Sequence, residues 1–144
     1  MSVRMGGETP KQFLSLEGVP IFIHTLRKFV NTDCIDDIFV GLRAEDMERA
    51  QREIDRENFA KSVRLVAGGP VRQETVARAL ALAPPTTEIV AVHDAVRPFI
   101  EREMIERVVE AARREGRSVI KVWSAGCSSG EEAYTLAMLV RGGE

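Results

Sequence analysis

The stretch Glu-Ile-Val-Ala-Val-His-Asp-Ala-Val-Arg-Pro, from Glu88 to Pro98, contains the residues best suited to chemistry. Its first half is apolar and β-branched, as in a buried strand, and Pro98 blocks continuation of that strand. In an open parallel α/β sheet, a polar strand end lies at the carboxyl edge, where ligands bind. Asp94 could therefore hold a magnesium ion, which favours oxygen ligands, and Arg97 could pair with an anion.

The same residues also fit a structural role. His93 and Asp94 could satisfy backbone groups of the loop, and Arg97 could pair with a neighbouring carboxylate. The residue pattern leaves both interpretations open.

A second candidate segment lies near the N-terminus. Arg4 and Lys11 are seven residues apart in a loop that contains Gly6 and Gly7. Such a loop would let backbone N–H groups and two cations approach a polyphosphate closely. Taken alone, an Arg/Lys loop of this kind is more often structural.

A third candidate is the strand-to-helix turn Gly-Gly-Pro-Val-Arg-Gln-Glu-Thr-Val that begins at Gly68. Gly68 and Gly69 leave room for a flat ligand against the backbone, and the Thr75 hydroxyl could exchange a hydrogen bond with a base. This motif is also weak when taken alone.

Alternating strands and helices must position these three segments. The pattern predicts helices over 20–30, 44–58, 72–83, 101–115 and 131–140, and strands over 35–42, 63–67, 88–93 and 118–123. This alternation is typical of βαβ units. We therefore expect a single α/β domain over residues 1–144, with a three-layer, doubly wound (Rossmann-like), mostly parallel sheet of about four strands.

The composition excludes several classes of function. The 144 residues are 44% hydrophobic and 29% charged with a net charge of −2, so nothing attracts the chain to nucleic acid or to an anionic membrane. No signal peptide and no bilayer-spanning run is recognisable. Cys34 and Cys127 lack metal-ligand spacing, so we expect reduced thiols and a cytoplasmic location.

The three motifs together resemble the 2-C-methyl-D-erythritol 4-phosphate cytidylyltransferases. They are Arg-Met-Gly…Pro-Lys-Gln-Phe-Leu, Gly-Gly-x-x-Arg-x-x-Thr-Val and His-Asp-Ala-x-Arg-Pro, and the resemblance covers residues 3 to about 117. It implies a nucleotidyltransferase of isoprenoid biosynthesis that uses Mg²⁺. Such an enzyme joins CTP to 2-C-methyl-D-erythritol 4-phosphate and releases pyrophosphate.

The resemblance also implies roles for individual residues. Arg4 and Lys11 match the catalytic cations that hold the triphosphate and stabilise the transition state. The nucleotide-binding residues that it implies are Gly68, Gly69 and Thr75 in a cytosine-reading turn, with threonine where the family usually has serine, and Asp94, near the ribose and the magnesium, and Arg97.

The chain also departs from the family pattern. Only residues 3–6 remain of a first strand and glycine loop, and the projecting β-arm and final lysine-bearing strand have no counterpart. These differences predict weak or lost catalysis, with an active nucleotidyltransferase as the alternative. Homodimerisation through exposed sheet edges would fit a truncated sheet.

Residues 121–140 resemble a different family. The run Trp-Ser-Ala-Gly-Cys-Ser-Ser-Gly-Glu-Glu is similar to the first S-adenosylmethionine-binding motif of chemotaxis receptor (protein-glutamate) methyltransferases. The resemblance implies a cofactor loop made of Ala125, Gly126, Cys127, Gly130 and Glu131. The alternative is that this strand–loop–helix unit is purely structural.

Two resemblances in one chain suggest recombination, natural or engineered. We expect residues 1–117 to be cytidylyltransferase-like and 118–144 methyltransferase-like, with strand 118–123 replacing the missing first strand at the centre of the sheet. The remaining alternatives are an S-adenosylmethionine-binding module and a scaffold that binds no cofactor or ligand.

Overall fold

The computed structural model describes residues 9–117, together with the backbone of 119–121 and 135–141. Short 3₁₀ turns η1 and η2 accompany four α-helices and seven strands in this part of the chain. In chain order the elements are η1 (Lys11–Phe13), β1 (Ser15–Leu16), β2 (Val19–Pro20), α1 (Ile21–Val30), β3 (Asp37–Leu42), η2 (Ala44–Asp46), α2 (Met47–Glu57), β4 (Val63–Ala67), α3 (Arg72–Ala81), β5 (Thr87–Asp94), α4 (Arg102–Glu115), β6 (Val119–Lys121) and β7 (Thr135–Arg141).

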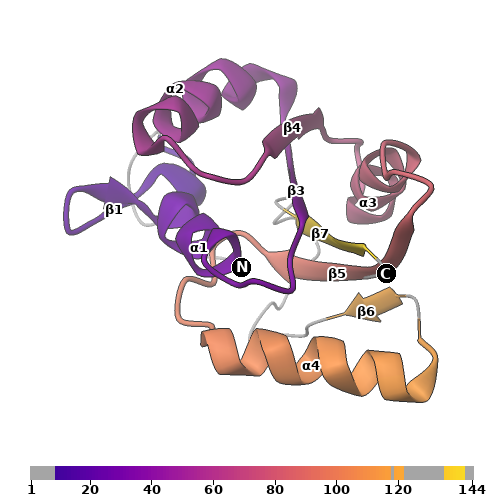
Figure 1. The fold of residues 1–144 in the computed structure, drawn as a ribbon. Coiled ribbons are helices and arrows are strands. Elements are labelled where there is room, and N and C mark those ends of the chain that lie inside the picture. The colour runs from indigo at the N-terminus through magenta and orange to yellow at the C-terminus, as the bar shows by residue number, and fades with distance from the viewer. Residues whose placement is uncertain (1–8, 118, 122–134, 142–144) are drawn as a thin grey trace, which may run out of the picture.

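The main sheet has five strands in the order β4-β3-β7-β5-β6 (Figure 1). The outer pairs, β3 with β4 and β5 with β6, are parallel. The central strand β7 is antiparallel to both of its neighbours, β3 and β5. The sheet is therefore mixed, and the expectation of a mostly parallel sheet of about four strands is corrected.

Helices cover both faces of this sheet, which gives three layers (Figure 1). The even-numbered residues of β3 face a core formed with α1, α2 and α4, whereas Phe39 faces a smaller core beneath α3. Val90 and Val92 of β5 join the smaller core, while Ile89 and Ala91 join the larger one. This alternation follows from the two-residue period of a strand.

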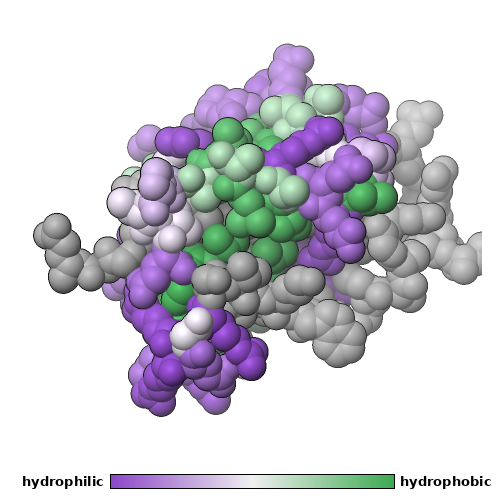
Figure 2. Space-filling view, turned by 90° about the vertical axis from the view of Figure 1, so that its right-hand side faces the viewer, coloured by the Kyte–Doolittle hydropathy of each residue, from purple (hydrophilic) through white to green (hydrophobic). Residues whose placement is uncertain are grey.

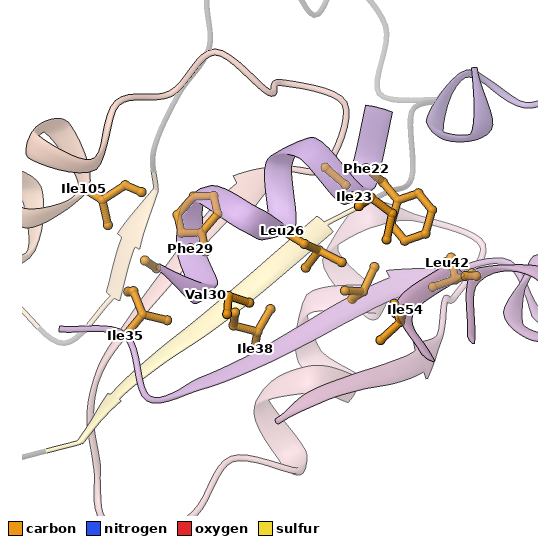
Figure 3. Packing of buried hydrophobic residues seen from close by; sticks show 14 of the residues in the cluster. Phe22, Ile23, Leu26, Phe29, Val30, Ile35, Ile38, Leu42, Ile54 and Ile105 are labelled. Atoms are coloured by element: carbon orange, nitrogen blue, oxygen red, sulfur yellow. The ribbon is translucent and has the colours of Figure 1, made fainter. Parts of the chain in front are cut away.

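Helix α1 supplies much of the larger core. Pro20 directly precedes the helix, and Phe22, Leu26 and Phe29 follow at spacings of four and three, which places them on one face. These residues are at most 2% exposed and lie against the face of the sheet that carries Ile38 and Leu42 (Figure 3). Burial of each such side chain contributes roughly 1.5–3 kcal/mol.

Apolar residues are exposed at both ends of α3. Figure 2 views the molecule from the right-hand side of Figure 1, where α3 lies, and shows apolar surface near the centre with hydrophilic side chains above it. Val71 precedes α3 and Leu82 follows it, and about half of each residue is exposed.

Strand β6 is not the central strand that the sequence suggested for residues 118–123. It pairs with β5 at the outer edge of the sheet, with Val119 opposite Val90. The prediction that this segment replaces a missing first strand is wrong. An apolar strand is compatible with either position, because both faces of this sheet are covered by helices.

The predicted helix over residues 131–140 is also wrong for its described part. Residues Thr135–Arg141 form β7, which occupies the slot between β3 and β5. A short run of Leu, Ala, Met and Val is ambiguous between buried helix and strand. Here the pairing with two strand edges, which is not local in sequence, outweighs helix propensity.

The hairpin formed by β1 and β2 is not among the elements predicted from the sequence. Its two-residue turn uses Glu17 at φ 53° and Gly18 at φ 80°. Positive φ at both positions is the requirement of a type I′ turn. The His24 ring of α1 bonds the Leu16 carbonyl at 2.7 Å from Nε2, which ties the hairpin to the helix.

Four predicted helices and the strand Val63–Ala67 are confirmed, as is the end of α4 at Gly116, where φ is 65°. No helix among the described residues combines the length and apolar character needed to cross a bilayer.

A bidentate ion pair joins α1 to α2. Arg27 Nε and Nη2 lie 2.7 and 2.8 Å from the carboxylate oxygens of Glu57, and this hydrogen bonding lowers the pKa of Glu57. A lowered folded-state pKa means that the pair stabilises the protein above the ordinary glutamate pKa. That contribution is lost as the pH falls through the lower folded-state value.

We predict that Glu57→Gln lowers the free energy of unfolding near pH 7 by up to about 1 kcal/mol, because the pair is partly exposed. The difference from wild type should shrink as the pH falls below the ordinary glutamate pKa, as measured by urea denaturation across pH. Glu48→Gln, in an exposed pair with Arg52 on the same α2 helix, is the control and should change little. A pH-independent effect of Glu57→Gln would contradict the prediction.

Candidate functional site

Asp94 is the last residue of β5 and begins a tight turn at the carboxyl edge of the sheet. Its Oδ1 accepts the Val96 N–H at 3.1 Å, and its backbone carbonyl accepts the Arg97 N–H at 3.2 Å. Its Oδ2 lies 3.8 Å from Arg97 Nε. The residue is only 4% exposed, so its carboxylate has a fixed direction.

His93 supports this turn from the protein interior. Its Nε2 lies 3.1 Å from the Arg97 carbonyl oxygen, and its ring centroid lies 5.1 Å from that of Phe29 on α1. Burial lowers the pKa of His93, against the opposing effects of the Arg97 carbonyl and of Asp94. The neutral ring donates its Nε2–H to the carbonyl, because a carbonyl oxygen can only accept.

The second predicted segment is the turn between β4 and α3. The Gly68 N–H donates to the Leu42 carbonyl at 2.7 Å, which ties this turn to the end of β3. The Thr75 hydroxyl accepts the Gly69 N–H at 3.0 Å and is almost fully buried. The hydroxyl that the sequence predicted to read a base therefore holds the glycine turn in shape, and its contact with a base stays a prediction.

A glycine is needed at position 69 because a side chain would not fit there, and not because of the backbone dihedral angles. A Cβ atom built there would lie 2.5 Å from the Cβ of Glu74 in the first turn of α3. Arg78 fixes the other side of the turn by donating to the Ala67 and Gly68 carbonyls, each at 3.1 Å. The turn is thus held from the end of β3 and from α3.

The sheet brings these two turns to one edge. The glycine turn follows β4 and is bonded to the end of β3. Strands β3 and β5 lie on either side of β7, which places the ends of β3 and β5 about 10 Å apart at ordinary strand spacing. Arg72, at the start of α3, lies close enough for its charge to help lower the pKa of His93. A cation from the glycine motif therefore acts on the His-Asp motif.

Lys11 is the first residue of η1. Its neighbours Gln12 and Phe13 are buried and line a small apolar cavity with Leu42, at the end of β3, and Ala95, just beyond β5. Lys11 itself is exposed. Arg4, its predicted partner, lies outside the described residues.

The described residues fit a substrate-associated magnesium ion better than a resident one. Among them no group of three or more His, Cys, Asp and Glu side chains could enclose a metal. Mg²⁺ commonly uses one or two carboxylates together with waters and substrate phosphates. Asp94, at the sheet edge, is compatible with that arrangement.

A comparison with protein-family models matches residues 1–125 to 2-C-methyl-D-erythritol 4-phosphate cytidylyltransferase. The chain belongs to this family. Among curated relatives, the cytidylyltransferase of Acidobacterium capsulatum is 46% identical over 112 residues, which are 77% of this chain and 47% of the relative. That of Solibacter usitatus is 43% identical over 116 residues, which are 81% of this chain and 48% of the relative.

A solved structure supports the fold. 4-Diphosphocytidyl-2C-methyl-D-erythritol synthase from Anaerococcus prevotii matches with a TM-score of 0.64 at 19% identity, over 87% of this chain and 62% of that one. This chain spans about half the length of the curated relatives that it matches.

The methyltransferase resemblance gains no support from these comparisons. The cytidylyltransferase match continues to residue 125, past the boundary expected near 117. The predicted cofactor loop, Ala125, Gly126, Cys127, Gly130 and Glu131, lies outside the described residues. Binding of S-adenosylmethionine there stays a prediction.

Sequence reasoning missed three residues that shape the site. Arg72 stands within the quoted glycine motif, so the motif itself was the available signal. Arg78 and Thr25 act on backbone carbonyls 10 and 70 residues away, respectively. Such distant contacts leave no local pattern in the sequence.

We predict that Thr75→Val destabilises the protein by about 1 kcal/mol, because it removes the acceptor for the Gly69 N–H while keeping the side-chain volume. Thr75→Ser keeps the hydroxyl and is the matched control. Urea denaturation measures both variants. A stability of Thr75→Val equal to that of the wild type would contradict the prediction, because the hydrogen bond would then contribute nothing.

Proposed function

We propose that this chain is an Mg²⁺-dependent nucleotidyltransferase unit that binds CTP and transfers its cytidylyl group to 2-C-methyl-D-erythritol 4-phosphate. The observation that supports this most is the convergence of two turns, after β4 and after β5, at one edge of the sheet. Membership of the cytidylyltransferase family supports the choice of nucleotide and of acceptor.

In this proposal the Gly68–Gly69 turn receives the cytosine, with its backbone and the Thr75 hydroxyl as hydrogen-bonding groups. Both turns are held by internal hydrogen bonds, so little ordering is needed when the ligand arrives. Asp94 and Arg97 face the ribose and phosphate end of the nucleotide.

The chemistry asks mainly for positioning and for neutralisation of charge. A phosphate oxygen of the acceptor attacks the α-phosphorus of CTP, and the bond to the β-phosphate breaks to release pyrophosphate. In this proposal Lys11 and Arg4 stabilise the negative charge on the triphosphate. Mg²⁺, when bound, would neutralise part of the same charge.

The proposal includes a second copy of the chain as a partner. In the described part of the chain, the outer strands β4 and β6 each pair with another strand along one edge only. Such edges are the parts of a sheet that can pair with another chain.

Titration calorimetry with CTP and Mg²⁺ tests the nucleotide site. We expect saturable binding, preferred over ATP and GTP, and an Asp94→Asn variant that binds at least about tenfold more weakly, a difference of about 1.4 kcal/mol. The amide of this variant would keep the oxygen that accepts the Val96 N–H, so the turn should survive. Asp55→Asn, on the exposed face of α2, is the control.

Pyrophosphate release in the presence of CTP and 2-C-methyl-D-erythritol 4-phosphate tests the transfer step. Release that depends on both substrates is the expected result. CTP binding without pyrophosphate release would contradict the proposed transfer step and would support a nucleotide-binding domain instead. Absence of CTP binding would overturn the proposal.

A further inference from the structure

Helix α1 contacts the Asp94–Arg97 turn at two points on its interior side. Thr25 Oγ1 donates to the Ala95 carbonyl at 2.7 Å, and both groups are buried. One turn further along the helix, the Phe29 ring packs against His93, whose Nε2 bonds the Arg97 carbonyl. The helix thus holds the turn directly through Thr25 and indirectly through His93.

The Thr25 hydrogen bond departs from the ordinary behaviour of a helical threonine. Such a hydroxyl usually donates to the carbonyl four residues earlier, which here is Ile21 at 3.4 Å. The hydroxyl has one proton, and the much shorter contact to Ala95 takes it. A residue that is 0% exposed therefore uses its only donor on a turn 70 residues away.

His93 shows a similar specialisation. The ring is 3% exposed, and its Nδ1 has no hydrogen-bond partner among the described atoms. An apolar ring would fill this space beside Phe29 without leaving a buried polar atom unsatisfied. The histidine is explained by its bond to the Arg97 carbonyl.

Together these contacts fix the backbone of the turn from the protein interior. The carbonyls of Asp94, Ala95 and Arg97 accept bonds from the Arg97 N–H, from Thr25 and from His93, respectively. With the backbone held in this way, the side chains of Asp94 and Arg97 project in fixed directions. Binding sites built on such supported groups lose less entropy when a ligand binds.

We infer that Thr25 and His93 are positioning residues, which hold the Asp94–Arg97 turn in the geometry that receives the metal–nucleotide complex. The inference rests on the proposed function. It adds two residues that touch neither base nor phosphate and that act through the backbone of the turn.

Matched variants separate positioning from simple stability. Thr25→Val removes the hydroxyl at constant volume, and Thr25→Ser restores it. Thr32→Val is the control, because Thr32 is equally buried and its hydroxyl bonds the Lys28 carbonyl within its own stretch of chain. His93→Phe removes the bond to Arg97, and His93→Gln offers a replacement donor.

Amide hydrogen exchange at Val96 and Arg97 measures how firmly the turn is held, and it needs no ligand. We expect Thr25→Val and His93→Phe to accelerate this exchange at least about tenfold and to weaken the binding of CTP with Mg²⁺ by a similar factor. Thr32→Val should leave both quantities unchanged even where it lowers Tm, and Thr25→Ser should restore both.

The outcomes distinguish the inference from the proposed function. Unchanged exchange in Thr25→Val and His93→Phe overturns the inference, whatever happens to affinity. Faster exchange with unchanged affinity also overturns it, because the residues would then hold the turn without positioning it for a ligand. If wild-type protein fails to bind CTP, the proposed function fails and the positioning role fails with it, while the exchange data still decide whether the two residues hold the turn.

Discussion

Strand β7 is the constraint on which the described sheet depends. It joins two parallel pairs, β4 with β3 and β5 with β6, and in the described part of the chain no backbone pairing links β3 to β5 directly. Removing it would expose two inner edges, with rows of unpaired N–H and C=O groups. The larger core contains residues of α1, α2 and α4 together with residues of both strand pairs, so the same strand also supports that core.

The candidate site inherits this dependence. Its glycine turn is tied to the end of β3, and its Asp94 turn follows β5. Because β7 lies between β3 and β5, this strand sets the spacing between the two turns. Thr135, the first residue of β7, pairs with both Gly41 and Asp94. Helix α1 adds a second link, because it packs on β3 and bonds the turn after β5.

Features that depend on local sequence were predictable, and those that depend on distant pairing were not. The strand Val63–Ala67, the stop at Gly116 and the polar end of β5 follow from patterning and turn chemistry. The positions of β6 and β7 follow from which edges are left to pair, which no local window contains. The interpretation of His93, Asp94 and Arg97 as residues that satisfy the loop backbone describes the contacts observed. Binding of a ligand by Asp94 and Arg97 is the proposal built on those contacts.

The central position of β7 is tested most directly by nuclear Overhauser contacts between backbone protons. The register places Met138 opposite Ile38 of β3 and opposite Ala91 of β5. The account predicts interstrand contacts from Met138 to both residues in the same sample. Contacts to only one of them, or helical contacts along residues 135–141, would contradict it.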